Sequence, residues 1–132
     1  HPVSAAVALE VIRLYEDGLL ENGVIAGRRF AQHLERLSSH PLVGDTRSRG
    51  MVGAIELVCN KDTKAGFDAG LDVGGRLTRL TWENEVVVRC FPQGVIGFAP
   101  ALCCSEAEMD EIVARVENRS TSCSNCPTSE QA

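Results

Sequence analysis

Arg89 is a residue of this chain whose side chain is able to bind a small anion. It follows the apolar run 86–88 at the end of a strand-like segment. A guanidinium can hold a carboxylate through two parallel hydrogen bonds, which fix the orientation of the ligand. Phe91, two residues further on, shares its strand face. The spacing alone favours another interpretation, in which Arg89 pairs at the surface with Glu83 or Glu85 and Phe91 belongs to the core.

The other residues that could do chemistry lack a suitable setting. Lys61 and Lys64, the two lysines of the chain, lie in the polar segment 60–68, where no apolar pocket would lower the pKa of an amine. We expect both to be solvated, and neither to form a Schiff base. His33 and His40 have no Ser, Cys or Asp spaced to form a relay, so we expect structural or exposed roles. The sequence therefore assigns no catalytic residue.

The six cysteines do not predict a disulfide framework or a metal site. A domain of this length can bury a core without disulfides, so we expect reduced thiols and a cytoplasmic protein. Cys123 and Cys126 have the spacing of metal ligands, but a zinc site needs four ligands. The nearest candidates, Cys103 and Cys104, are adjacent and flank the last helix at its other end.

Composition argues against two classes of partner. The net charge is −5, and the basic residues, including Arg47 and Arg49, are scattered among acids, so we expect no nucleic acid partner. Arg47 and Arg49 are interpreted as solvated charges. No apolar run approaches the roughly 20 residues that cross a bilayer, so we expect no membrane partner. The chain begins with His1 rather than Met, which fits a fragment or a processed product.

Hydrophobic periodicity predicts four helices around two strand pairs. The helices are expected at 2–20, 21–37, 71–81 and from Ser105 onward, where Ser105 and Glu108 form a capping box. Ile25, Phe30, Leu34 and Leu37 should be the buried residues of the second helix. The strands are expected at 42–58, as a pair meeting near Arg49 and Gly50, and at 85–91 and 95–99 as a second hairpin.

Two hairpins with helices layered against them predict an α+β fold with one small, mostly antiparallel sheet. Residues 1–117 should form this single domain. The polar segment 118–132, which is poor in aliphatic residues, should be a disordered tail.

Four segments in this order resemble the C-terminal small domain of class III, ω-transaminase-like, aminotransferases. They are an Ala-rich helix ending in the residues 15–19, the stretch 40–57, the residues 87–89 with 97–102, and the start of the last helix at 105–112. The resemblance covers the chain from His1 to about Val116. The chain departs from the family pattern at Ser48, where the family often has Gly, and at Ala101, where it often has a second Pro.

The resemblance implies a fold-type I enzyme that uses pyridoxal phosphate to move an amino group from an amine or amino acid to a keto acid. It implies that Arg89 binds the substrate carboxylate and that Phe91 lines the pocket. It also implies that the Schiff-base lysine and the phosphate-binding groups lie earlier in the parent sequence. The fragment alone would then be inactive and free of cofactor, and the parent a homodimer.

Two alternatives stay open at this stage. A free-standing α+β binding or oligomerisation module could share the layout, because one fold serves many functions. A decarboxylase or an aminomutase of the same family would share the segments and differ in its reaction. An exposed apolar surface would favour the fragment of a larger enzyme over the free-standing module.

Overall fold

The computed structural model describes residues 1–120, with side chains as far as Glu117. Four α-helices and four strands follow one another as α1 (Pro2–Leu14), α2 (Leu20–Leu37), β1 (Val43–Arg49), β2 (Val52–Leu57), α3 (Val73–Glu83), β3 (Arg89–Cys90), β4 (Val95–Phe98) and α4 (Glu106–Ser120). A π-helical turn (Tyr15–Leu19) joins α1 to α2, and a 3₁₀ turn (Ala69–Leu71) precedes α3.

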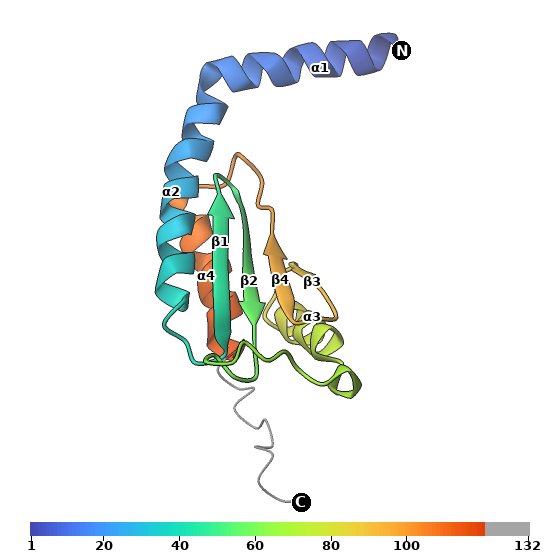
Figure 1. The fold of residues 1–132 in the computed structure, drawn as a ribbon. Helices are drawn as coiled ribbons and strands as arrows, with labels where there is room; N and C mark the ends of the chain where they lie inside the picture. Colours follow the sequence, from blue (N-terminus) through green and yellow to red (C-terminus); the bar gives the residue numbers. More distant parts are fainter. Residues whose placement is uncertain (121–132) are drawn as a thin grey trace, which may run out of the picture.

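The four strands form one sheet in the order β1-β2-β4-β3, and all three pairings are antiparallel. β1 and β2 form a hairpin that turns at Gly50, whose φ of 56° places it in the left-handed region that glycine tolerates. β3 and β4 form the second hairpin (Figure 1). This arrangement confirms the predicted α+β fold with two hairpins in one antiparallel sheet.

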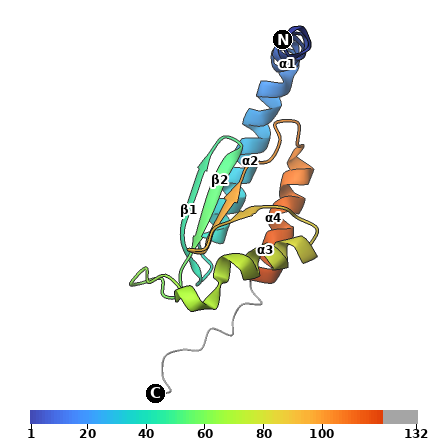
Figure 2. The same cartoon turned by 90° about the vertical axis from the view of Figure 1, so that its right-hand side faces the viewer.

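The core lies between the sheet and the helices α2 and α4, which cover the same face (Figures 1 and 2). Phe30 and Leu34 of α2 and Met109 and Val113 of α4 are almost completely buried, as is Ile96 of β4. The rings of Phe30 and Phe98 meet edge to face at 5.5 Å, a favoured aromatic geometry. Among the described residues, no helix covers the opposite face of the sheet.

The first helix extends away from this core. None of residues 2–14, all of them described, is buried, and Figure 1 shows α1 leaving the end of α2 at a steep angle. The bend lies at Asp17 and Gly18, where Gly18 has a φ of 94°. The predicted helix at 2–20 is therefore confirmed as an α-helix up to Leu14, but none of its apolar side chains is buried.

One residue of the predicted core is placed wrongly. Ile25 was expected to face inward, yet its side chain is 45% exposed. Gly23, Ala26 and Gly27 are buried in its place. A Cβ on Gly27 would lie 2.9 Å from the carbonyl carbon of Gly50, so the hairpin turn packs directly on the helix backbone. A pattern based on large apolar residues misses a contact made by small ones.

The strand predicted at 85–91 is also wrong over most of its length, because only Arg89–Cys90 pairs with β4. Glu85 has a φ of 57°, and the amide of Val86 donates a 3.0 Å hydrogen bond to the carbonyl oxygen of Thr81. These contacts hold the segment against the end of α3, so it cannot join the sheet before Arg89. Val86 is buried, whereas Val87 is 79% exposed.

The remaining boundaries agree with the expectations to within a few residues. α3 runs two residues later than predicted, and its first turn is capped by Asp72, which accepts a 3.3 Å hydrogen bond from the amide of Gly75. The capping box at α4 is confirmed, since Ser105 and Glu108 exchange hydrogen bonds through their backbone amides. α4 continues to Ser120, into the segment expected to be a disordered tail; residues 121–132 lie outside the described part of the chain.

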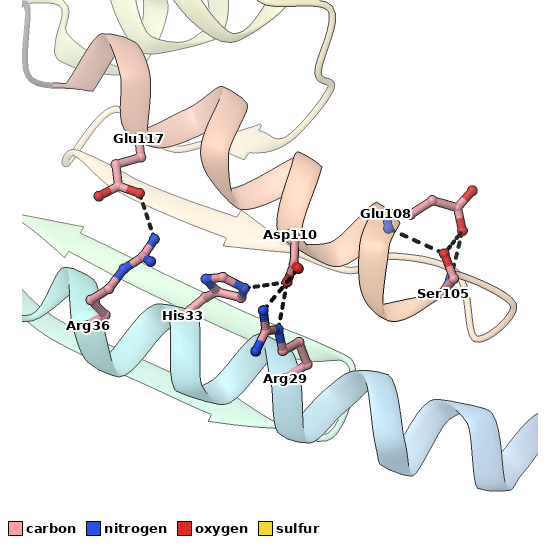
Figure 3. A network of polar contacts seen from close by, with 7 residues as sticks. All are labelled: Arg29, His33, Arg36, Ser105, Glu108, Asp110 and Glu117. Carbon is pink, nitrogen blue, oxygen red and sulfur yellow. Dashed lines mark hydrogen bonds and ion pairs between the residues drawn. The ribbon is translucent and has the colours of Figure 1, made fainter.

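Polar side chains join α2 to α4 along their exposed edge (Figure 3). Asp110 accepts hydrogen bonds from Arg29 Nε at 2.7 Å and Arg29 Nη2 at 3.0 Å, and its Oδ1 lies 2.5 Å from His33 Nε2. About two turns further along each helix, Arg36 of α2 pairs with Glu117 of α4 at 2.8 Å. The two helices that cover the sheet are thereby held in register. His33 has a structural contact, in agreement with its predicted role.

α3 is fixed to the second hairpin by a close backbone contact. A Cβ on Gly74 would lie 2.7 Å from the carbonyl oxygen of Phe91 and 2.9 Å from the Cα of Pro92. Only glycine allows the helix to approach the chain this closely. The turn itself is closed by the amide of Gly94, which donates a 3.0 Å hydrogen bond to the Phe91 carbonyl.

We predict that Asp110→Asn lowers stability in a pH-dependent way. Hydrogen bonds from Arg29 and His33 hold the pKa of the Asp110 carboxyl well below its usual range in the folded state. The unfolded carboxyl titrates near its ordinary value of about 3.9, so its stabilising effect is complete above about pH 5 and is lost as the pH falls toward the folded pKa. The variant should show a lower urea midpoint near neutral pH and a smaller further drop below about pH 4.

Asp62→Asn, in an exposed loop, is the matched control for this measurement and should follow the wild-type pH profile. Parallel profiles for Asp110→Asn and the wild-type chain would contradict the prediction.

We predict that Gly74→Ala destabilises the chain, because the added methyl group meets backbone that cannot rotate away. Overpacking of this kind costs about 1–3 kcal/mol, against a gain of up to about 1 kcal/mol in helix propensity. Urea unfolding should give a net loss of about 1 kcal/mol. Gly66→Ala is the control, since a Cβ there meets nothing within 4 Å; equal stability of the two variants would refute the predicted contact.

Candidate functional site

The side chains of Arg89 and Phe91 project from the face of the sheet that carries no helix. β-strand side chains alternate between faces, and Cys90 between them packs against the core. On the neighbouring strand, Ile96 and Phe98 point into the core, so Gly97 lies on the open face. The register places Gly97 directly opposite Arg89. The structure thus brings together Arg89 and Phe91, the two residues to which the family resemblance assigned a binding role.

An open concavity of about 490 Å³ lies on this face. Residues of β2, β3 and β4 and of the segments next to β3 and β4 line it: Val52, Gly53, Val87, Val88, Arg89, Phe91, Gly97, Phe98 and Ala99. Among these lining residues Arg89 alone carries a charge. The concavity therefore offers one fixed positive group surrounded by apolar and backbone surface, which suits a ligand with one acid group and an apolar body.

Arg89 has no ion-pair partner among residues 1–117. Its guanidinium carbon instead lies 5.4 Å from the centre of the Phe91 ring, within the range of a cation–π contact. Glu85, one of the surface partners considered for it, pairs with Arg115 at 3.0 Å. Phe91 is 40% exposed and is therefore not the core residue that its spacing alone favoured. The arginine is available to an external anion.

The backbone that follows Arg89 is well fixed. The amide of Phe91 donates a 2.8 Å hydrogen bond to the carbonyl oxygen of Val95, which closes the hairpin. Gly94 adopts a φ of 87° in its turn. The contact of Gly74 with the Phe91 carbonyl adds a support from α3. These contacts anchor the strand that carries the guanidinium.

The lysines lie away from the concavity. The Lys61 ammonium donates hydrogen bonds to the carbonyl oxygens of Ser38 at 2.5 Å and His40 at 3.4 Å, which ties the loop after β2 to the end of α2. Lys64 is exposed in the same loop. Lys61 is therefore exposed as predicted, but it makes a structural contact that its loop position did not reveal.

The other candidates have structural surroundings. His40 Nδ1 accepts a 3.2 Å hydrogen bond from the amide of Leu42. Arg47 pairs across the hairpin with Glu56 at 2.9 Å and, within β1, with Asp45 at 3.0 Å. Its charge is therefore paired at the surface rather than free. Arg49 is exposed.

The cysteines divide into described and undescribed positions. Cys59, Cys90, Cys103 and Cys104 are free thiols, and burial raises the pKa of the Cys90 thiol. Cys123 and Cys126 lie outside the described residues. In the described part of the chain, no three His, Cys, Asp or Glu side chains gather to hold a metal ion. No helix of residues 1–120 combines the length and apolar character needed to span a membrane.

The sequence missed most of the wall of the concavity. Val52, Val87 and the pair Gly97 and Ala99 come from three separate segments, and their proximity depends on which strands pair and in what register. The alternation of side chains along β4 was the one sequence signal that placed Gly97 on the open face, because Gly97 stands between two apolar residues that face the core. That signal does not identify its neighbour across the sheet.

Comparison with known proteins gives a consistent result. The family model of class III aminotransferases matches residues 1–119. The chain is 38% identical over 120 residues to an uncharacterised aminotransferase of Sinorhizobium fredii, y4uB, with 89% of this chain and 26% of that protein aligned. It is 38% identical over 116 residues to the putrescine–pyruvate aminotransferase of Pseudomonas aeruginosa, with 86% of this chain and 25% of that protein aligned.

Solved structures agree in fold. An (S)-enantioselective ω-transaminase from Thermomicrobium roseum superposes with a TM-score of 0.86 at 35% identity, covering 92% of this chain and 27% of the other. The chain thus spans about a quarter of the length of the relatives that it matches. On the family match, the sequence identity and the shared fold, this chain belongs to the class III aminotransferases.

Proposed function

We propose that this chain is the C-terminal small domain of a pyridoxal-phosphate-dependent class III aminotransferase, and that Arg89 binds the carboxylate of the amino acid or keto acid substrate. The observation that carries the proposal is the position of Arg89. It is the single charged residue among the described residues that line the concavity, and it has no ion-pair partner in residues 1–117. Two parallel hydrogen bonds from its guanidinium would orient a carboxylate against the apolar wall.

The described residues do not fit a covalent cofactor site. Pyridoxal phosphate needs a lysine amine for its Schiff base and groups that hold its phosphate. The ammonium of Lys61 is bound to two carbonyl oxygens, Lys64 is exposed, and no lysine lines the concavity. Under this proposal the cofactor is held by other parts of the enzyme, and the chain alone neither binds it covalently nor transfers amino groups.

The match in sequence favours this function over a free-standing module that only shares the layout. Identity of 38% spread over 120 residues is far more specific than an α+β architecture. The relatives are described as aminotransferases, one of them acting on putrescine and pyruvate. This supports amino transfer over the decarboxylase and aminomutase alternatives.

The exposed apolar surface of α1 supports a larger assembly. Val7, Leu9 and Ile12 are each at least 50% exposed, as is Val24 of α2 beyond the bend. A single-domain protein rarely leaves such a surface uncovered. We include in the proposal that this surface packs against the rest of the enzyme and that the enzyme is a homodimer. The interpretation of the cysteines as reduced thiols adds that the enzyme is cytoplasmic.

We predict that pyruvate binds this chain at Arg89. In amide ¹H–¹⁵N spectra at constant ionic strength, sodium pyruvate should shift the resonances of residues 87–91 and 97–99, which flank the concavity. Arg89→Gln should weaken binding by about tenfold or more, because a hydrogen bond to a charged group contributes about 1.5–3 kcal/mol.

Arg79→Gln, which removes an exposed arginine from α3, is the control and should leave binding unchanged. Pyruvate binding that survives in Arg89→Gln, or that disappears equally in Arg79→Gln, would rule out the proposed site.

We also predict that the isolated chain self-associates through α1. Sedimentation velocity should show a concentration-dependent dimer or larger species, and Val7→Gln with Ile12→Gln should shift the population toward monomer, because exposed apolar area drives association. The control is Ser4→Gln with Arg13→Gln, which changes the same helix without removing apolar side chains. A wild-type chain that stays monomeric over the whole concentration range would count against a covered α1.

A further inference from the structure

We infer that Phe91 is a positioning residue, which acts by holding the Arg89 guanidinium over the concavity in the orientation that receives a carboxylate. This inference rests on the proposed function of Arg89 and adds a role for its neighbour. The two side chains emerge from the same face of the chain, two residues apart, and the guanidinium carbon lies 5.4 Å from the centre of the ring. No carboxylate among residues 1–117 competes for the arginine.

Gly97 fixes the place of the ring. It lies opposite Arg89 in the register, and a Cβ built on it would stand 3.5 Å from Cε2 of Phe91 and 3.7 Å from Cβ of Arg89. The ring therefore lies over the bare backbone of a strand glycine, an arrangement that compensates for the missing side chain. A larger side chain at Gly97 would occupy the space that the ring now fills.

The contact leaves the hydrogen-bond donors of the arginine side chain free, because no side-chain N–H group of Arg89 donates to another residue among residues 1–117. A guanidinium can stack on an aromatic ring and still bind a carboxylate through its N–H groups. Phe91 can therefore restrict the side chain without occupying its donors. An exposed arginine otherwise loses much rotamer freedom when it binds, and a contact that already restricts it reduces this loss. The apolar ring also keeps water from one side of the guanidinium.

A purely structural role for Phe91 makes different predictions. The side chain is 40% exposed and lies outside the group of buried core residues. Its replacement by Leu, of similar apolar character, should leave the fold intact. The two roles are separated by the guanidinium resonance of Arg89, which senses the ring directly, and by substitution with Tyr, which keeps an aromatic face.

The test is arginine side-chain NMR on the full chain labelled with ¹⁵N-arginine, with sodium pyruvate as the probe and sodium chloride as the ionic-strength control. The Arg89 Nε–Hε resonance, assigned from its absence in Arg89→Gln, should be shifted upfield by the ring current in the wild-type chain and in Phe91→Tyr. Phe91→Leu should lose this shift and bind pyruvate about two- to fivefold more weakly, the equivalent of an exposed cation–π contact. Phe91→Tyr should bind within about twofold of wild type.

Gly97 supplies a second pair of variants that leaves Phe91 in place. Gly97→Val should displace the ring, reduce the upfield shift and weaken binding, whereas Gly97→Ala should do neither, since its Cβ makes ordinary contacts. Equal pyruvate affinity in wild type, Phe91→Leu and Gly97→Val would overturn the positioning role while leaving Arg89 as the binding residue. Absence of a pyruvate response in the wild-type chain would instead overturn the proposed function, and the positioning role with it.

Discussion

The alternation of side chains along β4 is the constraint on which this site depends. Ile96 and Phe98 are buried under α2 and α4, so Gly97 must lie on the open face, and the antiparallel register sets it beside Arg89. A slip of one residue would turn the arginine toward the core, where an unpaired charge is very costly. The same packing that stabilises the domain therefore determines which side chain reaches the concavity. Binding on one face follows from burial on the other.

The sequence was sufficient to predict the elements of this fold because most of its signals are local. Apolar periodicity located the helices, the Ser105–Glu108 pair located the start of α4, and turn residues separated the strands. It failed where the determining contact is between distant segments. Gly27 is buried because a hairpin turn rests on it, and residues 86–88 stay out of the sheet because Val86 bonds to Thr81 at the end of α3. Neither contact has a signature within its own segment.

The same distinction applies to the site. Arg89 and Phe91 were identified as site residues from the resemblance of their segment to class III aminotransferases, and their spacing of two residues places them on one strand face. Gly97, Val52 and Ala99 could be identified only with the sheet order. The contacts that the sequence analysis missed are mostly contacts made at glycines. At Gly74 and Gly97 the useful property is an absent Cβ, which lets α3 support the hairpin and leaves space for the Phe91 ring. Sequence patterns that are based on side-chain chemistry do not detect a role that depends on a missing side chain.

The most direct test of the account is a crystal structure of the chain grown with sodium pyruvate. We expect the pyruvate carboxylate within hydrogen-bond distance of two guanidinium nitrogens of Arg89, above Gly97, with the Phe91 ring still in contact with the guanidinium. A structure in which Arg89 turns away to pair with a protein carboxylate, or in which pyruvate binds elsewhere on the chain, would contradict it.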